Sequence, residues 1–115
     1  MSGTKTLLAL ALTVAVTMPA VAAHRKTFSP SAGVLCDEYV CADANGLSKN
    51  LTARFLGAAE ATKLFSQVTS DGTEFTFANG VFCDTKERIC HKDRYFENGK
   101  RSATAVRSTA ILFGK

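Results

Sequence analysis

The chain has 115 residues, the usual size of a single domain, and its 14 Lys and Arg residues outnumber its 10 Asp and Glu residues, giving a net charge of +4. This charge is mild and mixed in sign along the chain, which argues against a nucleic-acid-binding protein. The sequence contains no Walker loop, no Gly-x-Ser-x-Gly turn and no His-Glu-x-x-His helix, and it has only two histidines. We therefore do not expect an enzyme.

The first 23 residues have the form of a secretory signal peptide. Lys5 gives a positive start, an apolar run follows, and the segment ends in small residues. The run is shorter than the roughly 20 apolar residues of a transmembrane helix. Cleavage after Ala22 or Ala23 would leave one mature domain, residues 24–115, with no transmembrane segment and with a net charge of +3, because removal of Lys5 lowers +4 by one. The Ala-rich cleavage site indicates a bacterial periplasmic or secreted protein.

A short phrase occurs twice in the mature chain, as Gly-Val-Leu-Cys-Asp at residues 33–37 and as Gly-Val-Phe-Cys-Asp at residues 80–84. A second cysteine follows each copy, Cys41 after the first and Cys90 after the second. The match extends upstream into aromatic and hydroxyl-bearing residues, which indicates an internal duplication. The aspartate of each phrase is expected to cap a turn, as Asp side chains commonly do.

The four cysteines predict two disulfides, because the exported compartment is oxidising and because the spacings C-x4-C and C-x6-C lack the C-x2-C of zinc sites. Local geometry favours Cys36 with Cys41 and Cys83 with Cys90, each pair facing across neighbouring strands. The alternative joins the two units through Cys36 with Cys83 and Cys41 with Cys90. It closes longer loops and would stabilise more in the chain-entropy model, by about 4 kcal/mol per bond against about 2.

In chain order, the first cysteine unit predicts a β-hairpin that turns at residues 38–39, and residues 47–68 have a helical pattern. Ser48 is a suitable N-cap for that helical segment. Gly57 interrupts the pattern, so either two short helices or one bent helix would fit.

The second cysteine unit predicts a clearer hairpin, because Asn79-Gly80 is the preferred dipeptide of a two-residue type I′ turn. Such a turn pairs Phe77 with Phe82, puts both on one core face with Phe75, and points Cys83 to the other face. A polar turn then leads into a third strand, residues 89–96, which places Cys90 opposite Cys83 and His91 opposite Phe82.

A second Asn-Gly dipeptide predicts a turn at residues 97–100. Residues 102–113 are ambiguous, because their Thr and Val content suits a strand while their apolar residues recur at helical spacing; we favour a helix. The expected fold is a small α+β domain in which antiparallel β-hairpins pack against one or two helices and two disulfides hold the chain.

Two sets of residues are candidate sites. After cleavage, His24 would lie at or next to the new α-amine, and with His91 it could bind copper(II), which imidazole and amine nitrogens suit. A flanking His24 and a structural His91 would explain the same residues without a metal. Aromatic and basic residues near the hairpin ends could contact a protein partner, as Tyr and Arg often do at interfaces. This set is Tyr39, Lys86, Arg88, Arg94 and Tyr95.

Five stretches of the chain carry a resemblance to known proteins, and together they span nearly all of residues 27–114. They are Phe28-Ser29-Pro30, Gly33-Val34-Leu35-Cys36-Asp37, Tyr39-Val40-Cys41-Ala42-Asp43, Glu74-Phe75-Thr76-Phe77-Ala78-Asn79-Gly80-Val81-Phe82-Cys83-Asp84 and Asp93-Arg94-Tyr95-Phe96. On these stretches the chain resembles the Fels prophage-like protein family of small exported proteobacterial proteins. The resemblance implies export, the cysteine framework and a single domain, and it brings no catalytic residues.

We therefore expect a non-catalytic exported binding protein, associated with the envelope or with stress, whose partner is a protein or an envelope component. One alternative is a periplasmic copper-binding protein that uses His24. A second alternative is an inhibitor of a cell-wall hydrolase such as lysozyme.

Overall fold

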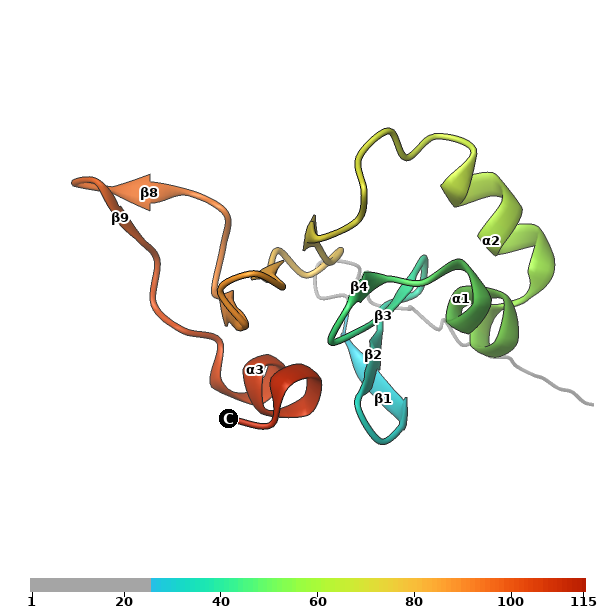
Figure 1. Cartoon of the computed structure of the whole chain (residues 1–115), viewed down its shortest axis with the longest axis horizontal. Helices are drawn as coiled ribbons and strands as arrows, with labels where there is room; N and C mark the ends of the chain where they lie inside the picture. Colours follow the sequence, from blue (N-terminus) through green and yellow to red (C-terminus); the bar gives the residue numbers. More distant parts are fainter. Residues whose placement is uncertain (1–25) are drawn as a thin grey trace, which may run out of the picture.

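A computed structural model describes residues 26–115, so the segment assigned to the signal peptide and His24 lie outside the described residues. The described chain is an α+β domain of short antiparallel sheets and three helices (Figure 1). No helix within residues 26–115 is long and apolar enough to cross a bilayer. The elements in chain order are β1 (Phe28–Ser31), β2 (Val34–Cys36), β3 (Cys41–Asp43), β4 (Gly46–Leu47), α1 (Lys49–Leu56), α2 (Ala58–Phe65), β5 (Glu74–Thr76), β6 (Phe82–Asp84), β7 (Ile89–His91), β8 (Phe96–Glu97), β9 (Lys100–Arg101) and α3 (Val106–Phe113).

The fold uses the same unit twice. In the first unit the sheet β1-β2-β3-β4 leads into α1 and α2; in the second, the sheet β5-β6-β7 leads through the separate hairpin β8–β9 into α3. Each unit joins its second cysteine to its helix through a buried threonine. The backbone N–H of Cys41 donates to Thr52 Oγ1 at 2.9 Å, and that of Cys90 donates to Thr109 Oγ1 at 2.9 Å. These matching contacts support the duplication predicted from the repeated phrase.

The disulfides are the local pairs. Cys36 bonds to Cys41 and Cys83 bonds to Cys90, and each pair lies directly opposite across two antiparallel strands. All four cysteines are fully buried. Cysteines at facing positions on neighbouring strands therefore form the disulfides. The alternative that joins Cys36 to Cys83 and Cys41 to Cys90 is excluded.

The register predicted for the second hairpin is wrong by one residue. β5 and β6 pair Thr76 with Phe82 and Phe75 with Cys83, so the connection is a five-residue loop, residues 77–81, and not a two-residue turn. A type I′ turn needs positive φ at both central residues, and here Gly80 has φ 96° while Asn79 does not. The Asn79 side chain instead accepts the Val81 N–H at 3.0 Å.

This shift by one residue changes which side chains reach the core. Phe75 and Phe77 share a face as predicted, with their rings edge to face at 5.3 Å. Because Phe75 lies opposite Cys83, the disulfide shares that core face, whereas Phe82 lies on the other face and stacks on His91 at 6.5 Å. The predictions that Phe82 would join Phe75 and that Cys83 would point away were both wrong, as expected of a one-residue slip.

The helical predictions hold. The predicted helical segment, residues 47–68, contains the helices α1 and α2 and is longer than they are, since Leu47 lies in β4 and α2 ends at Phe65. The two helices meet at Gly57, whose φ of 111° breaks the helical path, and Ser48 caps α1 by accepting the Leu51 N–H at 3.0 Å. In the last segment, residues 102–113, Val106–Phe113 form the helix α3, as favoured, and residues 102–105 precede it.

The predicted third strand was too long. β7 ends at His91, and residues 92–103 leave the sheet as a two-stranded ribbon whose end is the hairpin β8–β9. The turn predicted there is confirmed: Asn98 and Gly99 have φ values of 55° and 78°, as a type I′ turn requires.

One core joins the two units. It is formed by buried apolar side chains from both sheets and from α3, and the second disulfide lies within it. Its members are Leu35, Val40, Ala42, Phe75, Phe77, Cys83, Cys90, Leu112 and Phe113.

Candidate functional site

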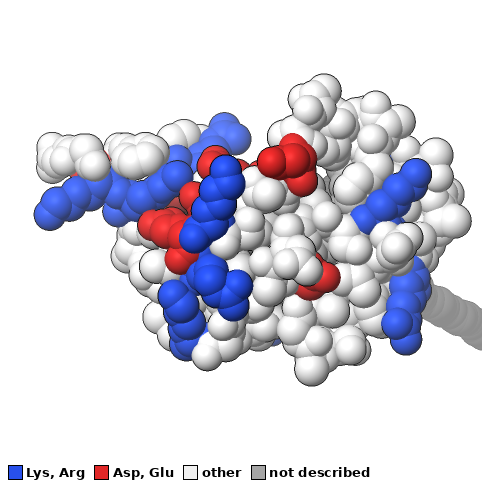
Figure 2. Space-filling view, viewed as in Figure 1, with Lys and Arg blue, Asp and Glu red and all other residues white. Residues whose placement is uncertain are grey.

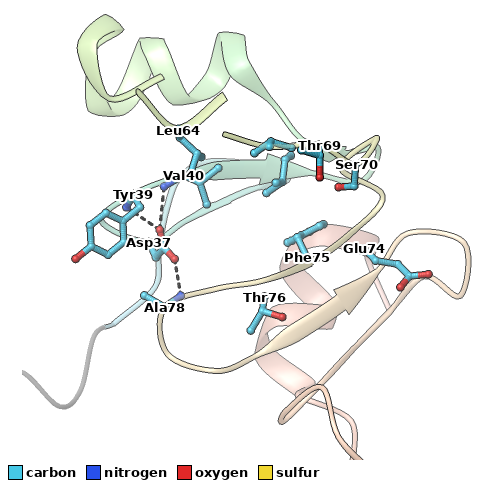
Figure 3. Close-up of a pocket in the computed structure, with 12 residues that line it drawn as sticks. Asp37, Tyr39, Val40, Leu64, Thr69, Ser70, Glu74, Phe75, Thr76 and Ala78 are labelled. Carbon is cyan, nitrogen blue, oxygen red and sulfur yellow. Dashed lines mark hydrogen bonds between the residues drawn. The ribbon is translucent and has the colours of Figure 1, made fainter. Parts of the chain in front are cut away.

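A groove of about 540 Å³ lies between the two units. One wall is the outer edge of β5 with Ala78 after it, and the opposite wall comes from the turn between β2 and β3, from α2 and from the loop that follows α2 (Figure 3). Apolar side chains from both walls line it. They are Val40, Leu47, Leu64, Val68 and Phe75.

Asp37 fixes one end of this groove. Its Oδ1 accepts the backbone N–H groups of Tyr39 at 2.7 Å and Val40 at 2.9 Å, which is the predicted turn cap. Its Oδ2 accepts the Ala78 N–H at 2.6 Å from the other unit, as the dashed lines in Figure 3 show. The carboxylate is only 2% exposed. Asp37 therefore connects the two units as well as capping its own turn.

The equivalent Asp84 makes only the local cap. Its Oδ1 accepts the N–H groups of Lys86 at 2.8 Å and Glu87 at 3.2 Å. Its Oδ2 lies 4.0 Å from the Arg101 guanidinium. The two copies of the repeated phrase thus share the capping role, and only the first copy reaches across to the second unit.

The outer edge of β5 presents to the groove backbone groups that bond to no other residue within residues 26–115. Thr73 and Phe77 bond to the residues that flank β6, through Thr85 N to Thr73 O at 2.9 Å and Phe77 N to Val81 O at 2.9 Å. In an antiparallel strand, the backbone N–H and C=O groups of alternate residues point to the same side. The backbone groups of Phe75 therefore also point toward β6. The N–H and C=O groups of Glu74 and Thr76 therefore point outward, where no further strand of this sheet lies within residues 26–115.

The charges that line the groove are negative. Its carboxylate side chains are Asp37, which is occupied by backbone donors, and the exposed Glu74. A smaller cavity of about 170 Å³ adjoins it and shares Tyr39 and Leu64 with it. The site combines hydrogen-bonding backbone, an apolar lining and one accessible carboxylate.

A third carboxylate lies in the loop beside the groove. The Asp71 side chain accepts hydrogen bonds from the Thr73 hydroxyl at 2.8 Å and from the Thr73 N–H at 3.1 Å. These bonds favour the ionised form and lower the pKa of Asp71. Thr69 and Ser70, which precede Asp71 in this loop, line the groove.

The five residues predicted to bind a partner do not form one surface. Tyr39 lies at the groove, whereas Lys86 and Arg88 lie in the turn between β6 and β7, with the Arg88 guanidinium 5.2 Å from the Phe113 ring centroid. Arg94 and Tyr95 lie on the separate ribbon of residues 92–103, in contact with each other at 5.3 Å. Sequence reasoning missed the β5 edge, although the alternation of Glu74 and Thr76 with buried phenylalanines signals a strand with one polar side.

His91 is buried and both of its ring nitrogens are occupied. Nδ1 lies 2.7 Å from the carbonyl oxygen of Ser102, and Nε2 lies 2.9 Å from Oε1 of Glu87. To bind a metal, His91 would have to give up one of these contacts. Within residues 26–115, no group of three or more His, Cys, Asp and Glu side chains is arranged to hold a metal ion. Copper binding through His24 stays a prediction, as does inhibition of a cell-wall hydrolase.

Comparison with known proteins places the chain in a family. The model of the YcgJ protein family matches residues 27–113, which is nearly the whole described chain. The chain belongs to the YcgJ family. A relative from Escherichia coli (strain K12), "Uncharacterized protein YcgJ", is 50% identical over 85 residues, covering 73% of this chain and 70% of the relative. No solved structure matches. The YcgJ matches carry no link to prophages, so that part of the Fels prophage-like resemblance stays a prediction.

Proposed function

We propose that the protein is a non-catalytic exported binding protein, and that it holds an extended segment of a protein partner in the groove along β5. The observation that carries this proposal is the row of outward-facing backbone groups at Glu74 and Thr76 beside an apolar groove. The two buried disulfides support export, because such bonds persist in oxidising compartments such as the periplasm.

An exposed strand edge is a template for another strand. A peptide that lies beside β5 would exchange backbone hydrogen bonds with Glu74 and Thr76, and its alternate side chains would enter the groove. The Asp37 carboxylate already accepts the next outward N–H, that of Ala78. That bond closes this end of the edge, so a bound peptide would end or turn away there.

The lining of the groove specifies the partner segment. Its apolar walls suit Val, Ile or Leu at alternate positions, which is the pattern of a strand that buries one face. Glu74 is its accessible charge, so a Lys or Arg near that position would be complementary. We therefore propose a partner segment of β-branched or aliphatic residues that carries a basic side chain.

A random heptapeptide library displayed on phage, selected on the oxidised mature protein, tests this proposal. Thr76→Pro removes the outward N–H but no hydrogen bond to β6, and proline is tolerated at sheet edges. Thr76→Val is the matched control, because it changes the same side chain and keeps the N–H. We expect aliphatic, basic peptides that bind the wild type and Thr76→Val alike and bind Thr76→Pro at least tenfold more weakly.

Two results would contradict the proposal. One is a selection that enriches no peptide on the wild type over Thr76→Pro. The other is a dimer of the free protein in light scattering that Thr76→Pro dissociates, since a second copy of the chain would then be the occupant of the edge.

A further inference from the structure

The ribbon of residues 92–103, here called the arm, projects from the second unit at the end of the molecule opposite α1 and α2 (Figure 1). Its base is a short ladder in which Lys92 N donates to Ala103 O at 2.8 Å and Asp93 N donates to Ser102 Oγ at 3.0 Å. The Arg101 guanidinium lies 4.5 Å from the ring centroids of both Phe82 and Phe96, which joins the arm to the sheet. The arm is thus an ordered projection.

The arm is an addition to the repeated unit. In the first unit, the Cys41 carbonyl accepts the N–H of Ser48, seven residues later, at the start of α1. In the second unit, the Cys90 carbonyl accepts the N–H of Ala105, fifteen residues later, at the start of α3. The first unit makes the same strand-to-helix connection with eight fewer residues, so the connection itself does not require the arm.

The exposed chemistry of the arm is aromatic and basic. Tyr95 and Phe96 are 63% and 60% exposed, among the most exposed large apolar side chains of the described chain. Four cations accompany them against two acids, which gives the arm a net charge of +2, and Figure 2 shows Lys and Arg side chains gathered along it. The cations are Lys92, Arg94, Lys100 and Arg101, and the acids are Asp93 and Glu97.

We infer that the arm docks onto an anionic phospholipid surface. Aromatic side chains prefer the boundary between headgroups and acyl chains, and Lys and Arg beside them are attracted to anionic headgroups. Tyr95 and Phe96 would enter this boundary while Lys92, Arg94 and Lys100 contact the phosphates. This inference stands apart from the proposed function, because the arm and the groove share no residue.

A lipid surface fits the arm better than an acidic protein does. A stable protein interface buries about 800 Å² on each partner. A two-stranded ribbon of twelve residues offers little flat area for such a contact. Insertion of two neighbouring rings requires no such area, because lipids close around a narrow projection.

Sedimentation of the oxidised mature protein with vesicles tests the inference. Vesicles of phosphatidylcholine alone are compared with vesicles of phosphatidylcholine and phosphatidylglycerol in equal parts. We expect partition at least tenfold stronger on the anionic vesicles, decreasing with added salt. Two double variants change the arm: Tyr95→Ser with Phe96→Ser, and Arg94→Gln with Lys100→Gln. Each should partition onto the anionic vesicles at least fivefold more weakly than the wild type.

The control variant is Lys49→Gln with Lys63→Gln, which removes the same charge from the exposed surfaces of α1 and α2. It should partition within twofold of the wild type, and circular dichroism verifies that all variants fold. Equal losses in the control and arm variants would overturn the inference, because summed charge would then explain the binding. Absence of binding to both vesicle types would also overturn it and would point to an acidic protein.

Discussion

Single buried hydroxyls link the disulfide hairpins to their helices. Thr52 accepts the Cys41 N–H and donates to the Ser48 carbonyl at 2.7 Å; Thr109 accepts the Cys90 N–H and donates to the Cys90 carbonyl at 3.2 Å. Both threonines are buried. A buried backbone donor without an acceptor is unfavourable, so these two side chains should contribute strongly to stability.

Replacing either threonine by valine keeps the shape of the side chain and removes the acceptor. We expect Thr52→Val and Thr109→Val each to lower the free energy of unfolding by about 1–3 kcal/mol, because a cysteine N–H is left buried and unpaired. Urea denaturation of the oxidised protein measures this change. Thr62→Val, on the exposed face of α2, is the control and should change the free energy by less than about 0.5 kcal/mol. Equal effects at all three positions would contradict the role of the buried hydroxyls.

The sequence predicted roles for residues better than it predicted their long-range partners. Each aspartate of the repeated phrase caps its turn, as its type and position indicate. The bond from Asp37 to Ala78 spans forty-one residues. Local patterns carry no signal for such a contact, because it depends on how the two units pack.

At the scale of the elements, the two Asn-Gly turns show that local sequence does not predict the effect of tertiary contacts. A type I′ turn was predicted at Asn79-Gly80 and a turn of unspecified type at residues 97–100, and of these two only Asn98-Gly99 has the φ values of a type I′ turn. Asn98-Gly99 closes an exposed hairpin, β8–β9, whose turn lies away from the core. Around Asn79-Gly80, burial of the Phe77 side chain and the bond from Asp37 to Ala78 hold the chain in a longer loop. Tertiary contacts thus override turn preference where the turn adjoins the core.

The disulfides act at the scale of the hairpin, because each closes a short loop. In the chain-entropy model, loops of this size contribute about 2 kcal/mol each. We expect Cys36→Ala with Cys41→Ala to lower the free energy of unfolding by about this amount in urea denaturation, and Cys83→Ala with Cys90→Ala to lower it by at least as much, because the second disulfide lies in the main core. An unchanged free energy in either double variant would contradict a stabilising role.

At the scale of the whole molecule, the fold is two copies of one hairpin-and-helix unit that have diverged at their surfaces. The shared parts, which are the disulfide, the capping aspartate and the threonine contact, build the scaffold. The unshared parts are α2 with its loop, which form a wall of the groove, and the arm. The fold class was predictable from the local helical and strand patterns. The cysteine pairing and the duplication were predictable because the phrase that contains the cysteines occurs twice in the sequence. The groove was not, because its walls come from segments that only packing brings together.

The central claim is that the outward backbone groups of β5 are available to a partner strand, and amide hydrogen exchange measured by NMR tests it most directly. In the free protein, the Thr76 amide should exchange much faster than the Phe75 amide, which points toward β6, and the Phe77 amide, which bonds to Val81 O. Saturation with a peptide selected from the heptapeptide library should slow exchange at Thr76 at least tenfold and leave Phe77 little changed. A Thr76 amide that is already protected in the free protein, or that exchanges equally fast with peptide bound, would contradict the claim.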